Sequence, residues 1–146
     1  LIKEASDSFG CQCIVLAIDA YKDNNNVKSG YNVSTHGGKK KTNIDALQWA
    51  IEGERSGAGE ILLTSMNADG TKLGYDIELT SKISTEVSIP VIASGGAGKP
   101  LDMVNVLKKG GASAVLAASI FHFGIYTIEN VKKEMLKYNI PTRKTW

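Results

Sequence analysis

The sequence predicts an α/β fold built on a parallel β-sheet, and three observations support this fold class. Four short runs are almost continuously apolar: residues 13–18, 61–64, 90–93 and 114–118. Such runs are typical of strands buried on both faces, as in parallel sheets. Apolar residues at helical spacing follow each run, which indicates βα units joined by crossover helices. Polar and glycine residues come directly after the runs, at the end of the sheet where such folds bind their ligands.

The first predicted unit is a strand over residues 13–18 and a helix over residues 44–51, in which apolar residues recur at helical spacing. Asp45 suits the positive start of this helix. The segment 23–42 between the two elements is polar and rich in glycine and asparagine. Within it, Tyr31–Ser34 is predicted to form one half of a small hairpin.

Three further helices are predicted after the later apolar runs. Pro100 suits the first turn of one helix, and Thr127 is the expected N-cap of another. The apolar residues at helical spacing are Ile77, Ile83 and Val87; Leu101, Val104 and Leu107; and Ile128, Val131 and Met135. The alternation of four strands with four helices fits either a doubly wound sheet or half of an eight-fold barrel, and the pattern does not decide between them.

Composition limits the class of protein. The 146 residues are 42% hydrophobic, which suits one globular domain over residues 1–146 and excludes a disordered chain or a coiled coil. Seventeen basic and 15 acidic residues give a net charge of +2, too balanced for a nucleic-acid-binding protein. No apolar run approaches the roughly 20 residues of a membrane helix. Leu1–Ala5 is similar to the end of a helix, so we expect further residues upstream in the whole protein.

Cys11 and Cys13 flank a single residue at the start of the first predicted strand. At a period of two they would point to the same side, too close together for a normal disulfide. We interpret them as two small buried thiols rather than as a metal or redox site. Two cysteines are too few for a secreted disulfide scaffold, which favours the cytoplasm.

An anion site is predicted where the last two strands end. Ser94, Gly95 and Gly96 open a glycine-rich loop whose N–H groups could approach a phosphate, and Ala118 and Ser119 form a second loop of small residues. Two adjacent late loops of this kind match the usual phosphate site of eight-fold barrels. Because only two of the 17 basic residues are arginine, the phosphate would be held mainly by backbone amides and lysine.

Asp19 ends a hydrophobic strand, where a carboxylate is costly unless it is paired or used. It could act as a general acid or base, or only cap Lys22 or the next loop. Asp69 and Gly70 follow the second strand and are also a plain turn signal.

Lys39–Lys41, behind Gly37 and Gly38, is either a solvated run or part of a lid over an anionic substrate. His36 and His122 share no metal-ligand spacing with a cysteine or acidic residue, so no metal site is predicted.

Five stretches together resemble the cyclase subunit of imidazole glycerol phosphate synthase, from histidine biosynthesis. The most specific is Gly59–Met66, followed by Asp69–Lys72 and Gly74–Asp76. The sister phosphoribosyl-formimino isomerase has a related Asp-Gly-Thr turn but lacks the lead-in at 59–65 and the ending Phe121–Phe123. The stretches that carry the resemblance are 14–20, 35–42, 57–76, 90–98 and 115–123.

This resemblance implies a (βα)8 TIM barrel, of which the chain covers a (βα)4 half-barrel with strands five to eight, the N-terminal half being absent. It implies that Asp19 is one of two catalytic aspartates and that Thr64 lines the active site. It also implies that Glu60 belongs to a gate that admits ammonia from a glutaminase partner. The implied phosphate site consists of Asp69, Gly70, Ser94, Gly95, Gly96, Ala118 and Ser119.

In the implied lyase reaction, ammonia converts a bisphosphorylated ribulosyl compound to imidazole glycerol phosphate and an aminoimidazole carboxamide ribotide. No cofactor is required. Two other functions remain open at this point: a half-barrel that binds phosphate and forms a homodimer but turns nothing over, and the sister isomerase. For the 146 residues alone we expect phosphate binding without turnover.

Overall fold

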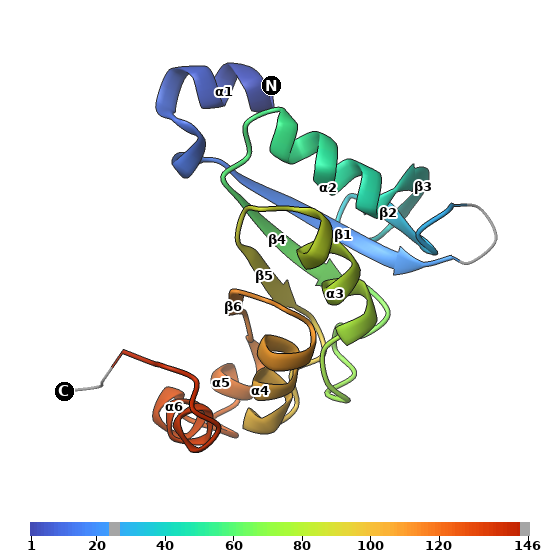
Figure 1. Ribbon diagram of the computed structural model, residues 1–146. Coiled ribbons are helices and arrows are strands. Elements are labelled where there is room, and N and C mark those ends of the chain that lie inside the picture. Colours follow the sequence, from blue (N-terminus) through green and yellow to red (C-terminus); the bar gives the residue numbers. More distant parts are fainter. Residues whose placement is uncertain (24–26, 144–146) are drawn as a thin grey trace.

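A computed structural model describes residues 1–23 and 27–143 (Figure 1). Residues 24–26, within the polar segment 23–42, and residues 144–146 lie outside the described part. The elements are α1 (Ile2–Phe9), a 3-10 turn η1 (Cys11–Cys13), β1 (Val15–Lys22), β2 (Tyr31–Thr35), β3 (Lys40–Asp45), α2 (Ala46–Arg55), β4 (Glu60–Ser65), α3 (Ile77–Glu86), β5 (Val91–Ser94), α4 (Pro100–Lys109), β6 (Ala114–Val115), α5 (Ser119–His122) and α6 (Ile128–Lys137).

Six strands form one sheet in the order β3-β2-β1-β4-β5-β6. The four strands β1, β4, β5 and β6 pair in parallel, as the apolar runs predict. The hairpin β2–β3 adds two antiparallel strands at the β1 edge. The predicted α/β class and the order of its four strand–helix units are confirmed, and the hairpin at Tyr31–Ser34 is confirmed as well.

One face of the parallel strands is buried and the other is partly exposed. Figure 1 shows α2 and α3 lying along one face of the sheet, and the side chains that point to them, such as Ile61 and Leu63, are almost inaccessible. The expectation that both faces are buried is wrong for this chain, because β4 alternates strictly between buried and half-buried residues. The second face nevertheless carries apolar side chains, among them Val15, Leu62 and Ile92.

The helices begin where the sequence indicates. The Asp45 carboxylate accepts from the N–H groups of Leu47 and Gln48 at 2.9 and 3.3 Å, and so caps α2. Thr127 Oγ1 accepts from the Asn130 N–H at 3.1 Å and caps α6. Pro100 occupies the first turn of α4, where its missing N–H costs nothing.

Three local predictions are wrong. Cys11 and Cys13 are exposed and lie in η1 rather than on a buried strand, because β1 begins only at Val15. Ile44 lies within β3 instead of opening α2. The last apolar run forms only the two-residue strand β6, and the chain then turns into α5, which was not predicted. Among the described helices, none has the length and apolar character needed to cross a membrane.

Candidate functional site

A small cavity lies where β4, β5 and β6 end, with a volume of about 130 Å³. Three segments line it: Asp69, Gly70 and Lys72 after β4, residues 94–97 from the last residue of β5 onward, and residues 116–119 after β6. The seven residues of the predicted phosphate site all lie in this lining. Loops far apart in the sequence therefore meet at one point because parallel strands end at the same edge of the sheet.

Glycine is required at the floor of the cavity. Gly95 and Gly96 have φ values of 89° and 99°, which side chains rarely permit. A Cβ on Gly95 would lie 2.8 Å from the Ser65 carbonyl oxygen, and one on Gly96 would collide with the Gly74 carbonyl oxygen. The Gly74 N–H also donates to the Gly96 oxygen at 2.8 Å, which fixes the distance between the two loops.

The amides available to an anion are fewer than the sequence suggests. The N–H groups of Gly98 and Lys99 donate to the Asp102 carboxylate at 3.0 and 2.9 Å. This carboxylate occupies the positive start of α4, so the helix dipole is already paired there. The useful part of the loop is therefore Ser94–Ala97, ahead of the helix.

Lys72 is the basic residue of the lining, and no local pattern in the sequence indicates its role. Its backbone has a φ of 59°, and its Nζ lies 5.9 Å from the centre of the Phe123 ring. The side chain thus extends from the β4 loop toward the segment that follows α5, and the exposed Asp69 lines the same cavity.

Asp19, Thr64 and Ser94 form one row across three strands. In the sheet register Asp19 is paired with Thr64, and Thr64 with Ser94. Residues paired in this way project from the same face, here the partly exposed one. The row therefore places a carboxylate and two hydroxyls along the edge that leads to the cavity, although Asp19 and Thr64 are not part of its lining. Lys22, the alternative partner considered for Asp19, pairs with Glu78 at 3.0 Å.

Glu60 lies at the opposite end of β4 from Thr64 and on the same face. They are four positions apart, which corresponds to about 13 Å along a strand. Glu60 therefore belongs to the amino-terminal end of the sheet, away from the cavity.

The loop with Gly37, Gly38 and Lys39 forms the tip of the β2–β3 hairpin. Gly38 packs so closely on the side chain of Met66 that a Cβ would collide with it. Because Met66 directly follows β4, the tip lies beside the carboxyl end of that strand. The loop does not contribute to the cavity lining.

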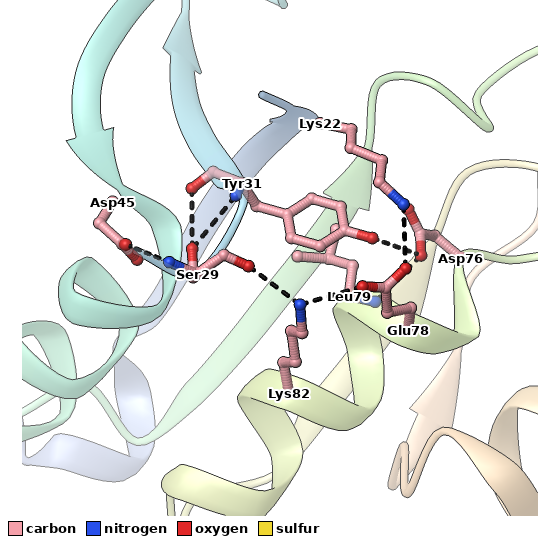
Figure 2. A network of polar contacts seen from close by, with 8 residues as sticks. All are labelled: Lys22, Ser29, Tyr31, Asp45, Asp76, Glu78, Leu79 and Lys82. Carbon is pink, nitrogen blue, oxygen red and sulfur yellow. Dashed lines mark hydrogen bonds and ion pairs between the residues drawn. The ribbon is translucent and has the colours of Figure 1, made fainter. Parts of the chain in front are cut away.

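A network of hydrogen bonds and ion pairs connects the β2–β3 hairpin to α3 (Figure 2). The Tyr31 hydroxyl donates to the Asp76 carboxylate at 3.3 Å, while Lys82 and Lys22 each contact Glu78 at 3.0 Å. Hydrogen bonds from the two lysines lower the pKa of Glu78 to about 2. Burial, together with the nearby carboxylates, raises the pKa of Tyr31. This network is not visible in the sequence, because its members come from four separate segments.

Comparison with known proteins shows which family the chain resembles. Residues 1–127 match the model of the histidine biosynthesis protein family. Three similar curated proteins are each named imidazole glycerol phosphate synthase subunit HisF, from Dehalococcoides mccartyi strains 195, BAV1 and CBDB1. They are 55%, 54% and 53% identical to this chain over 143 residues. In each case the match covers 98% of this chain and 55% of the relative. The chain thus spans about half the length of the curated relatives it matches.

Proposed function

The chain belongs to the histidine biosynthesis protein family, and from this premise we propose that it forms the C-terminal (βα)4 half of a cyclase-subunit barrel. The strands β1, β4, β5 and β6 would be strands five to eight of that barrel. Three facts support the assignment: the consecutive order of the parallel strands, the match to 55% of the relatives' length, and the apolar side chains on the open sheet face.

The half-barrel would hold one phosphate of a bisphosphorylated substrate. The observation that carries this proposal is the single cavity that gathers Asp69, Gly70, Ser94 and Ser119 with their neighbours from three loops. Backbone amides of a glycine-rich loop and the Lys72 ammonium suit an anion, and the small volume suits a group the size of phosphate.

In the whole barrel, Asp19 would serve as a general acid or base. Ammonia adds to the ketone carbon of the ribulosyl arm, and the ketone oxygen leaves as water. Ring closure then forms the imidazole and releases the amine of the carboxamide ribotide. Each step moves a proton, which a carboxylate at the mouth of the barrel can give or take. The row from Asp19 through Thr64 to Ser94 supports this role, because it connects the carboxylate to the phosphate end of the substrate.

A glutaminase subunit would supply the ammonia from the other end of the strands. Glu60 lies at that end of β4, which is the place for a gate. Glu60→Gln in the whole complex should reduce turnover with glutamine more than turnover with free ammonia. Equal losses with both nitrogen sources would remove Glu60 from the gate.

A second candidate function applies to these 146 residues alone: a half-barrel that binds phosphate but catalyses no reaction. The catalytic partner of Asp19 would come from the part of the relatives that lies outside the match. The names of the relatives favour the cyclase over the sister isomerase.

Phosphate titration of the chain by calorimetry tests the site. Gly96→Ala should abolish binding, because its Cβ would push the β5 loop away from Gly74. Gly37→Ala is the matched control: Gly37 also has a positive φ, of 63°, but its Cβ would meet nothing within 4 Å. Binding that survives Gly96→Ala, or is lost equally in both variants, would overturn the assignment of this cavity.

A further inference from the structure

The segment Gly74–Asp76 touches each of the three strand ends around the cavity without being part of its lining. The Gly74 N–H is bonded to Gly96 of the β5 loop. The Tyr75 hydroxyl donates to the Leu116 carbonyl oxygen, just after β6, at 2.9 Å. The Asp76 carboxylate accepts from the Ser65 hydroxyl, at the end of β4, at 3.1 Å.

The Tyr75 contact is the one that reaches the β6 loop. Tyr75 is only 7% exposed and packs in the hydrophobic cluster with Ala93 and Ala97, so its ring has a fixed position. Its hydroxyl bridges 41 positions in the sequence. Burial raises the pKa of this hydroxyl, which therefore keeps its proton and remains a donor at neutral pH.

Apart from the Tyr75 hydrogen bond, the segment after β6 has little support from the sheet. β6 is two residues long, and the Leu116 N–H makes the last bond to β5, donating to the Ala93 oxygen at 2.9 Å. Beyond that point the Leu116 carbonyl is held by Tyr75. Because a peptide unit is planar, a fixed Leu116 carbonyl also fixes the direction of the Ala117 N–H. Both residues line the cavity.

We propose that Tyr75 is a positioning residue of the anion cavity: its hydroxyl orients the peptide between Leu116 and Ala117 and so sets the affinity for phosphate. The proposal rests on the phosphate site proposed above. Tyr75 does not touch the ion. It holds the wall formed by residues 116–119 at the distance from the β5 loop that a phosphate requires.

Tyr75→Phe tests this, since it removes one oxygen and keeps the buried ring. Tyr21→Phe is the matched control, because the Tyr21 hydroxyl also donates to a backbone carbonyl, that of Thr42 at 3.0 Å, and Tyr21 is 8% exposed. Each variant loses the bond from its hydroxyl to a backbone carbonyl, and Tyr21→Phe also loses the bond that Asn32 Nδ2 donates to that hydroxyl at 3.3 Å. Tyr21→Phe should therefore lower the melting temperature at least as much as Tyr75→Phe. We expect inorganic phosphate to bind about tenfold more weakly to Tyr75→Phe and within about twofold of wild type to Tyr21→Phe.

Amide hydrogen exchange gives a second readout on the same variants. Exchange at residues 117–119 should accelerate in Tyr75→Phe and stay unchanged in Tyr21→Phe. Unchanged phosphate affinity in Tyr75→Phe, or equal losses in both variants, would overturn the positioning role. A wild-type chain that binds no phosphate would overturn the proposed function instead, and the exchange rates would still decide whether Tyr75 orders this wall.

Discussion

Asp19 lies in one row with Thr64 and Ser94 but outside the cavity lining. Its role in proton transfer can therefore be tested separately from phosphate binding. In the full-length barrel, Asp19→Asn keeps the shape but cannot exchange a proton, so turnover should fall by about 10²- to 10⁴-fold. Substrate affinity should change little, because the phosphates provide most of the binding. Steady-state kinetics with ammonia measure both.

Asp7→Asn is the control for this prediction. Asp7 lies on α1, exposed and paired with Lys3 at 3.6 Å, far along the chain from the cavity loops. It should leave kcat and KM unchanged. Near wild-type turnover in Asp19→Asn would show that this carboxylate does not take part in the reaction.

Glu78 gives a pH-dependent prediction at the residue scale. Its pKa is lowered to about 2 in the folded chain, against a usual value of 4.5. A depressed carboxyl pKa stabilises the fold above the unfolded value, and this contribution is lost as the pH falls toward 2. The Glu78 side chain is 52% exposed, so solvent screens its ion pairs and the contribution should stay below about 1 kcal/mol.

Urea unfolding of Glu78→Gln and wild type should therefore differ at pH 7 and converge near pH 2. Glu129→Gln is a useful comparison, because Glu129 makes a similar exposed pair with Lys133 on α6 alone and does not connect separate elements. A difference between wild type and Glu78→Gln that grows as the pH falls would contradict the sign of this contribution.

The site residues that could be predicted from the sequence are those set by position along a strand. Asp19, Ser94 and Gly95 follow apolar runs, and parallel strands bring such positions to one edge. Lys72 and Tyr75 could not be found in this way. Their roles depend on contacts with Phe123 and Leu116, more than 40 positions away, and neither a lysine nor a tyrosine in a loop carries a local signal.

At the scale of elements, Asp76 joins α3 to two strands. Its carboxylate caps the helix at the Leu79 N–H, 3.0 Å away, and accepts from the Ser65 and Tyr31 hydroxyls. Ser65 and Tyr31 are each 2% exposed, so without Asp76 two buried hydroxyls would lose a hydrogen-bond acceptor. Asp76→Ala should therefore lower the free energy of unfolding by about 2–4 kcal/mol.

Thr127→Ala is the matched variant for Asp76→Ala, since Thr127 caps the exposed start of α6 and bonds only within that turn. Its cost should be about 1 kcal/mol, that of a cap alone. Denaturant unfolding of both variants measures the difference. Equal costs would show that the bonds from Ser65 and Tyr31 to Asp76 contribute nothing to stability.

Elements with a local signal were predicted, and those fixed by tertiary contacts were not. Asp45, Pro100 and Thr127 mark helix starts because their chemistry acts within one turn. β3 is a lysine-rich edge strand with little apolar alternation, so its pairing with β2 had no signal in the sequence. The cysteines were misplaced because apolar character at Cys13–Ile18 does not distinguish a strand from the turn that leads into it.

At the scale of the whole molecule, the open sheet face predicts self-association. Val15 is 49% exposed on this face, and each Å² of exposed apolar area costs roughly 25 cal/mol. A second copy of the chain, related by a two-fold axis, would cover it most simply. We expect light scattering to give a homodimer at micromolar concentration.

Leu62→Lys should shift this equilibrium toward the monomer. Leu62 lies on the open face of β4, between β1 and β5, where a partner would cover it. Leu136→Lys is the control, an equally apolar residue that is 54% exposed on α6. A monomeric wild type, or equal effects of both substitutions, would show that this face does not mediate association.

A crystal structure of the chain with phosphate is the most direct test of the central claim, that the loops after β4, β5 and β6 form a phosphate site. The ion should lie between Gly70, the Ser94–Ala97 segment and Ser119, with the Lys72 ammonium moved from the Phe123 ring onto it. Phosphate found only elsewhere on the molecule, with the amides of Gly95 and Gly96 directed away from an empty cavity, would contradict the claim.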